Sequence, residues 1–214
     1  SFHLRDENVK LKPTDSTQVV PIRVVNGRMQ SFGLVLDKDT RDNRFRPTQG
    51  IHHSASLETT GGILKGPNSY TKLVFALRKY VPLSKGGKTV VALQGVGGRT
   101  KIDSGFVPVY DMFSVGGSDT IRGYREREFL GTRILYGNIE LRQRITKNFD
   151  VVGFLDAGDA WGLDYNRTQK DFNAKKGYGL GLRLLTPLGP VAIDYGIPTE
   201  KGEGRTYFNF GSSF

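Results

Sequence analysis

The chain has 214 residues, no cysteine, 28 glycines and a formal net charge of +10, which predicts one domain without a disulfide framework or a cysteine-based zinc site. Hydrophobic residues make up 37% of the sequence, and no apolar run approaches the roughly 18 residues that a membrane-spanning helix needs. A helical membrane protein is therefore excluded, whereas a transmembrane barrel, whose strands are apolar on one face only, fits this composition.

Alternation of apolar and polar residues, the pattern typical of β-strands, dominates the chain after a polar start. Asn26-Gly27 suits a two-residue hairpin turn between the first two predicted strands, and Leu188-Gly189-Pro190 suits another tight turn. The predicted strands span residues 19–25, 29–38, 51–60, 70–81, 89–99, 133–145, 149–161, 177–184, 191–197 and 205–214.

The predicted strand at residues 70–81 shows the alternation most clearly, with Leu73, Phe75 and Leu77 on one face and Lys72 and Arg78 on the other. Such strands fit a soluble β-sandwich or lipocalin-like barrel, which buries its apolar face, or a membrane barrel, which turns that face to lipid and keeps a polar lumen. Glycines on the polar faces and aromatic residues near the ends of the apolar faces favour the membrane barrel. We predict an all-β fold, a transmembrane antiparallel barrel with about eight to ten strands per chain.

A long loop interrupts the strands between Arg99 and Thr132. Long loops without regular structure are usually functional or disordered. This one contains glycines, which permit unusual backbone angles, and residues typical of a buried core such as Phe113 and Val115. Taken alone, the loop could also be an exposed segment rich in glycine and arginine.

The long loop contains the run Gly116-Gly117-Ser118-Asp119-Thr120-Ile121-Arg122-Gly123-Tyr124, which resembles the Val/Ile-Arg-Gly-Phe/Tyr loop of the BamA-type outer-membrane insertase/translocase superfamily. This superfamily includes BamA, TamA and FhaC relatives, the bacterial surface antigen barrels. Further similar motifs follow in the family's order, and together they cover the chain from about residue 28 to its end. They lie at residues 39–43, 47–50, 80–83, 138–140, 154–158, 186–190 and 194–196.

The resemblance implies that the long loop folds into the barrel lumen and that Arg122 contacts acidic groups on the barrel wall. The alternation places Glu140 and Asp156 on the lumen-facing side, so these two are the predicted partners of Arg122. The alternative is a lumenal charge pair without a mechanistic role, which would still fix the loop. The predicted functional motif comprises Gly116, Gly117, Ile121, Arg122, Gly123 and Tyr124. Three aromatic residues on one face are similar to the terminal signal of outer-membrane barrels: Phe208, Phe210 and Phe214.

The matched motifs correspond to the C-terminal part of the family's barrel, without its POTRA domains. We predict an N-terminal arm at residues 1–17 and an outer-membrane β-barrel or half-barrel at residues 18–214. The chain could close alone, combine with a second copy as a homo-oligomer, or be a fragment of a longer protein. An open sheet edge in lipid costs several kcal/mol for each unpaired backbone group, so closure or pairing is required.

The resemblance implies a protein in the outer membrane of a diderm, Gram-negative-type bacterium that assists insertion or translocation of polypeptides through a loop-braced barrel. Its expected partners are the lipid bilayer, with lipopolysaccharide or phospholipid, and client outer-membrane proteins. One alternative is a passive pore or structural barrel that has lost the insertase machinery, and the third is a soluble β-sandwich binding module.

No catalytic constellation, cofactor site or metal site is predicted. The adjacent His52 and His53 would point to opposite faces of a strand, which does not suit a shared metal ion. Lys88 follows two glycines, but Pro82 stands where a phosphate-binding loop needs its first glycine. The basic residues are scattered over strand faces and loops, so nucleic acid is not an expected partner. We expect a protein that is not an enzyme.

Overall fold

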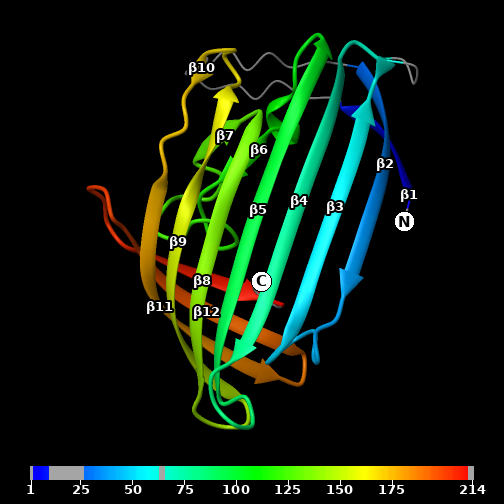
Figure 1. Ribbon diagram of the computed structural model, residues 1–214. Coiled ribbons are helices and arrows are strands. Elements are labelled where there is room, and N and C mark those ends of the chain that lie inside the picture. The colour runs from blue at the N-terminus through cyan, green and yellow to red at the C-terminus, as the bar shows by residue number, and fades with distance from the viewer. Residues whose placement is uncertain (1, 10–26, 63–65, 212–214) are drawn as a thin grey trace.

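The structure, a computed structural model, describes residues 2–9, 27–62 and 66–211. Most of these residues belong to one antiparallel sheet that curves around a concave side (Figure 1). Along the sheet, the strands follow the order β1 (Phe2–Val9), β2 (Gly27–Asp39), β3 (Gly50–Thr60), β4 (Ser69–Pro82), β5 (Thr89–Ser104), β8 (Arg133–Arg144), β9 (Phe149–Leu163), β11 (Lys175–Thr186), β12 (Gly189–Pro198) and β13 (Arg205–Phe210). The short strand β10 (Gln169–Lys170) pairs with the end of β9.

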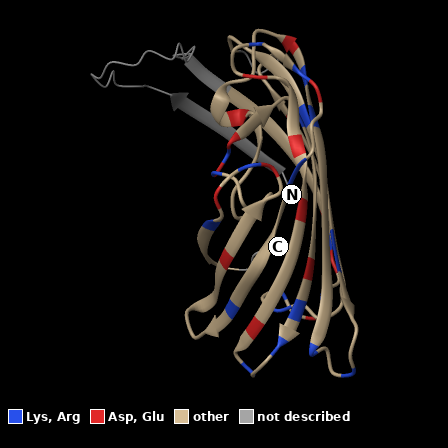
Figure 2. Cartoon of the chain, turned by 90° about the vertical axis from the view of Figure 1, so that its left-hand side faces the viewer, with Lys and Arg blue, Asp and Glu red and all other residues tan. Residues whose placement is uncertain are grey.

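The long loop between β5 and β8 has structure of its own. It contains the 3-10 turn η2 (Val109–Asp111) and a two-stranded sheet of β6 (Phe113–Val115) and β7 (Phe129–Gly131). This segment lies on the concave side of the main sheet, as the two side views show (Figures 1 and 2). The loop is therefore ordered, and it is lumenal as the family resemblance implied.

The ten strands along the sheet agree with the upper end of the predicted number, and the predicted strands from residue 29 onward correspond to β2, β3, β4, β5, β8, β9, β11, β12 and β13. The predicted strand at residues 19–25 and the turn at Asn26 lie outside the described residues. Residues 2–9, which we expected in an arm, form β1 and pair with β2 in register from Phe2–Leu34 to Val9–Gly27.

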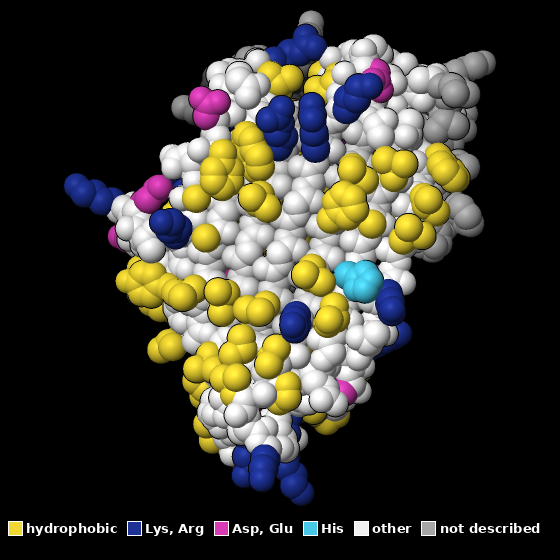
Figure 3. All heavy atoms as spheres, viewed as in Figure 1, with side chains coloured by type: hydrophobic (Ala, Val, Ile, Leu, Met, Phe, Trp, Pro, Cys, Tyr) yellow, Lys and Arg dark blue, Asp and Glu magenta, His cyan; other side chains and the backbone are white. Residues whose placement is uncertain are grey.

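The alternation turns apolar side chains outward and polar side chains inward. On β4, Leu73, Phe75 and Leu77 are 39%, 56% and 51% exposed on the convex side, whereas Tyr70 and Tyr80 are buried on the concave side. Figure 3 shows hydrophobic side chains spread over this convex face. The buried polar residues of the concave side include Gln94, Asn138, Glu140, Asp156 and Asp194. A soluble sandwich would bury the apolar side, so this arrangement is that of a membrane barrel wall.

The sheet is curved but not closed within the described residues. Its order begins at β1 and ends at β13, and these two edge strands are not paired with each other. Completion of the barrel by a second copy of the chain stays a prediction. In the described parts of the chain, no helix is long and apolar enough to cross a membrane.

A charge placed in the middle of the convex face tests its contact with lipid. Leu155 on β9 is 60% exposed and lies in register between Ile139 and Tyr178 of the neighbouring strands. Leu155→Arg is expected to lower the free energy of unfolding in lipid vesicles by about 2–4 kcal/mol, the cost of an arginine facing the bilayer centre. Denaturant titration measures it. Leu188→Arg, in a fully exposed turn, is the control, and equal effects of the two changes would contradict the lipid-facing assignment.

Candidate functional site

The segment between β6 and β7 is a compact loop with its own small core. Backbone N–H groups of Gly116 and Gly117 donate to Thr120 Oγ1 at 2.8 Å and to the Ile121 carbonyl at 3.1 Å. Both glycines have positive φ angles, 107° and 102°, which side-chain-bearing residues rarely adopt. The buried core joins the loop to the barrel wall and comprises Phe113, Val115, Ile121, Tyr124, Ile134 and Ala160. The loop is thereby held as one unit against β8 and β9.

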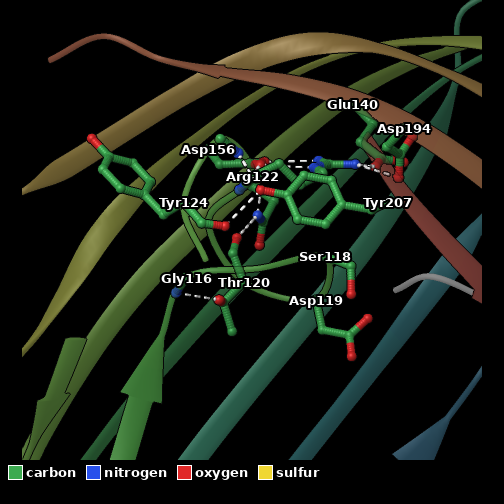
Figure 4. Close-up of polar contacts among 12 residues, drawn as sticks. Gly116, Ser118, Asp119, Thr120, Arg122, Tyr124, Glu140, Asp156, Asp194 and Tyr207 are labelled. Carbon is green, nitrogen blue, oxygen red and sulfur yellow. Dashed lines mark hydrogen bonds and ion pairs between the residues drawn. The ribbon is translucent and has the colours of Figure 1, made fainter. Parts of the chain in front are cut away.

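Arg122 projects from this loop onto the sheet and meets Asp156 of β9 in a bidentate pair. Its Nε donates to Asp156 Oδ2 at 2.7 Å and its Nη2 donates to Asp156 Oδ1 at 2.8 Å. The backbone N–H of Arg122 donates to the same carboxylate at 3.0 Å. Both side chains are almost fully buried, and a planar bidentate pair is the strongest arrangement these two groups can form (Figure 4).

Two more carboxylates complete the surroundings of the Arg122 guanidinium. Its Nη1 donates to Glu140 Oε1 of β8 at 2.6 Å and lies 3.4 Å from Asp194 Oδ2 of β12. Arg142 donates to Glu140 at 2.8 Å, and Arg183 of β11 donates to Asp194 at 2.6 Å and to Glu140 at 3.3 Å. We name this group the lumenal charge cluster: Arg122, Arg142, Arg183, Glu140, Asp156 and Asp194. Each buried charge therefore has an opposite partner, which offsets the cost of its desolvation.

The environment keeps the Arg122 guanidinium charged. Burial alone lowers its pKa, but the hydrogen bond to Asp156 and the charges of Glu140, Asp156 and Asp194 raise the pKa above its ordinary value. The guanidinium carbon also lies 3.4 Å from the centroid of the Phe154 ring, a cation–π contact. Phe154 shares the inward face of β9 with Asp156, so one strand supplies both contacts.

Glycines on β11 and β12 form the part of the barrel wall that contacts the backbone of the loop. A Cβ atom at Gly177 would lie 1.8 Å from the Arg122 carbonyl oxygen, and one at Gly196 would lie 2.7 Å from the Gly123 nitrogen. Gly123 itself has a φ of 104°, and a Cβ there would lie 2.6 Å from the Pro198 nitrogen. The backbones of loop and wall approach so closely that side chains at these positions have no room. This explains glycines on the polar side of otherwise regular strands.

The Tyr207 hydroxyl of β13 binds the loop just after Arg122. It accepts a hydrogen bond from the Gly123 N–H at 2.8 Å and donates one to the Tyr124 carbonyl at 2.6 Å. Tyr124 in turn donates through its hydroxyl to the Lys176 carbonyl of β11 at 3.2 Å. The loop therefore touches β8, β9, β11, β12 and β13, and it links strands that are not neighbours in the sheet.

Tyr207→Phe removes only the hydroxyl of this contact. We expect it to lower the free energy of unfolding by about 1–3 kcal/mol, because it leaves a buried N–H and a buried carbonyl unpaired. The measurement is equilibrium unfolding of the protein in detergent or vesicles. Tyr195→Phe, on the exposed side of β12, is the matched control and should change stability little. Identical effects of both changes would show that the loop contact is unimportant.

The structure brings the predicted residues Arg122, Glu140 and Asp156 together, and it places Ile121 and Tyr124 in the core of the loop. Phe208 and Phe210 are 68% and 87% exposed on the outer face of β13, away from this site, and Phe214 lies outside the described residues. The roles of these residues in activity stay predictions.

The sequence reasoning did not assign five contributors to this site: Arg142, Phe154, Arg183, Asp194 and Tyr207. Asp194 carried a signal, because it is an acid on the polar face of a strand and belongs to a family motif at residues 194–196. Its proximity to Arg122 depends on how far the sheet curves, which alternation does not reveal. Among the described residues, no group of three or more His, Cys, Asp or Glu is arranged to hold a metal ion.

Comparison with known proteins identifies relatives of the whole barrel segment. The Omp85 superfamily domain matches residues 26–214. The chain is 28% identical over 199 residues to the outer membrane protein assembly factor BamA of Nitratidesulfovibrio vulgaris, covering 83% of this chain and 24% of that protein. It is 29% identical over 207 residues to a SAM50-like protein of Schizosaccharomyces pombe, covering 86% of this chain and 44% of that protein. It is also 32% identical over 145 residues to the chloroplastic protein TOC75 of Oryza sativa, covering 64% of this chain and 18% of that protein.

A solved structure shares the fold. The crystal structure of BamA from Haemophilus ducreyi lacking POTRA domains 1–3 superposes with a TM-score of 0.70 at 22% identity, covering 87% of this chain and 42% of that chain. This chain therefore spans less than half the length of each of these proteins. The resemblance predicted from the loop motif and its companions is confirmed by the match over residues 26–214, and the chain belongs to the Omp85 superfamily.

Proposed function

We propose that this chain acts as the barrel part of an insertase or translocase in the outer membrane of a diderm bacterium, where it assists insertion or passage of other polypeptides. The observation that carries the proposal is the long loop, which is docked on the lumenal wall through Arg122 and its buried carboxylates. An assembly factor, BamA, is among the relatives of the chain. The proposed action is not enzymatic.

The proposed mechanism uses the difference in rigidity between the braced wall and the sheet edges. The loop ties β8, β9, β11, β12 and β13 into one body through the lumenal charge cluster and Tyr207. At the edge of the described sheet, β13 pairs on one side only, with β12. Backbone groups that lack a partner in lipid are costly, and an incoming strand can satisfy them by β-augmentation. We infer that a client strand would bind at such an edge while the braced wall keeps its shape.

The proposed partners are the surrounding lipids and unfolded client proteins of the same membrane. The convex side offers lipid an apolar surface of aliphatic and aromatic side chains (Figure 3). A bacterial BamA among the relatives supports the bacterial outer membrane as the location, although the family also includes fungal and chloroplastic proteins.

Reconstitution of the chain in liposomes tests the proposal. We expect a small client barrel to fold faster in vesicles that contain the wild-type chain than in empty vesicles, with Tyr195→Phe as an active control and Arg122→Ala as an impaired variant. Ion conductance without faster client folding would identify a passive pore instead. A chain that stays soluble and monodisperse without detergent would be a soluble β-sandwich module, and the membrane proposal would fail.

A further inference from the structure

Two arginines face each other on the convex side of the sheet. Arg99 of β5 and Arg133 of β8 are direct cross-strand partners, and both side chains are exposed. Lys101 lies two positions further along β5 on the same face, with 75% of its side chain exposed. Like charges directly opposite each other on neighbouring strands destabilise a sheet. The arrangement therefore calls for an anionic partner.

The chain supplies little counter-charge for this group within the described residues. Lys101 Nζ lies 3.2 Å from Asp103 Oδ1. The backbones of Arg99 and Arg133 pair in the sheet, but among the described residues their guanidinium groups take part in no hydrogen bond or ion pair. Both guanidinium groups consequently keep all their donors available to a ligand outside the protein.

The position of the three cations corresponds to a membrane interface. Arg99 lies opposite Leu73 of β4, and Arg133 lies opposite Trp161 of β9. The Trp161 ring packs edge-on against the Phe172 ring, with 4.9 Å between the ring centroids. Figure 3 shows Lys and Arg side chains gathered at the upper border of the convex face, with hydrophobic side chains below them. Aromatic residues and cations at the border of an apolar band are typical of the level of lipid headgroups.

We propose that Arg99, Lys101 and Arg133 bind the phosphate group of a membrane lipid with a net negative headgroup, whose acyl chains lie along the adjoining apolar face. Phosphate oxygens fit the planar fork of an arginine, and one phosphate between two guanidinium groups removes their repulsion. The source is a lipid and not free phosphate, because the apolar side chains beside the cations would contact the acyl chains of the same molecule. This site requires that the convex face lies in a bilayer, but it is independent of client insertion.

Native mass spectrometry of the full chain released from nanodiscs tests the proposal. The nanodiscs contain phosphatidylcholine mixed with phosphatidic acid, which exposes a phosphate monoester. We expect wild-type protein to retain phosphatidic acid in preference to phosphatidylcholine, and Arg99→Gln/Arg133→Gln to reduce this retention by about tenfold, as loss of hydrogen bonds to a charged group implies. The control is Lys79→Gln, another exposed cation of the convex face, which should retain the lipid like wild type.

Thermal unfolding gives a second, independent measurement on the same proteins. In phosphatidylcholine alone, Arg133→Gln should raise the melting temperature above that of wild type, because the repulsion is relieved. With phosphatidic acid present the order should reverse. Equal lipid retention by the double variant and Lys79→Gln, displacement of the lipid by equimolar inorganic phosphate, or an unchanged order of melting temperatures would each overturn the proposal.

Discussion

Arg122→Ala is expected to lower the free energy of unfolding by about 3–5 kcal/mol, the usual cost of removing one partner from a buried ion pair. The loss is uneven among the three carboxylates. Glu140 keeps Arg142 and Arg183. Among the described residues, Asp156 keeps no cationic partner and retains hydrogen bonds from the Asn138 amide at 2.8 Å and from the backbone N–H of residue 122. The uncompensated charge of Asp156 should therefore account for most of the effect. Equilibrium unfolding in vesicles measures the change.

Two further variants separate charge from geometry at this position. Arg122→Lys keeps the charge but not the planar fork of the guanidinium group. We therefore expect its free energy of unfolding to lie between those of the wild type and Arg122→Ala. Adding Asp156→Asn to Arg122→Ala removes the unpaired carboxylate and should recover part of the stability. If the loss of unfolding free energy in the double variant equals the sum of the losses in the two single variants, Arg122 and Asp156 are not energetically coupled.

Gly177→Val is expected to displace the whole loop from the wall. The first added atom would lie 1.8 Å from the Arg122 carbonyl oxygen, a distance that only a backbone movement can relieve. We expect a cost of at least about 2–3 kcal/mol, because the overpacking is compounded by weakened contacts of Arg122. Trypsin cleavage at the exposed Arg125 and Arg127 of the loop should become faster, and peptide mapping measures it.

Gly95→Val is the matched control for this change. Gly95 also lies in a long strand, β5, but a Cβ there meets no atom within 4 Å. The same substitution should leave stability and trypsin cleavage almost unchanged. Similar cleavage rates for the two valine variants would show that Gly177 is not a contact point for the loop.

Alternation predicted most of the sheet because a barrel wall has two faces of opposite polarity. The strand from Ser69 to Pro82 was predicted to within one residue at each end, and its outward Leu73, Phe75 and Leu77 are exposed as expected for a lipid-facing side. Pairing between segments that are distant in the sequence was harder to predict from the alternation. Strand β1 forms through its register with β2, and its polar sequence offered no local signal for that partner.

The parts of the site that depend on which face of a strand a residue occupies could be predicted from the sequence. The parts that depend on the curvature of the sheet could not. Glu140 and Asp156 were predicted as partners of Arg122 because the alternation puts both on the lumen-facing side of their strands, and the family motif implied that Arg122 lies in the lumen. Asp194 and Tyr207 reach the loop because β12 and β13 curve around it, a property of the whole sheet. The sequence showed the glycines that contact the loop, Gly177 and Gly196, only as part of a high glycine content. The need for glycine there depends on how closely the loop backbone approaches the wall, as at Arg122 and Gly177.

The composition of the lumenal charge cluster has a consequence for ion permeation. Three guanidinium groups and three carboxylates sum to zero, although the chain as a whole carries a formal charge of +10. Rings of one sign of charge make a pore selective for ions of the opposite sign. The six groups of the cluster therefore add no net charge to the lumen, and we expect the cluster itself not to select ions by the sign of their charge.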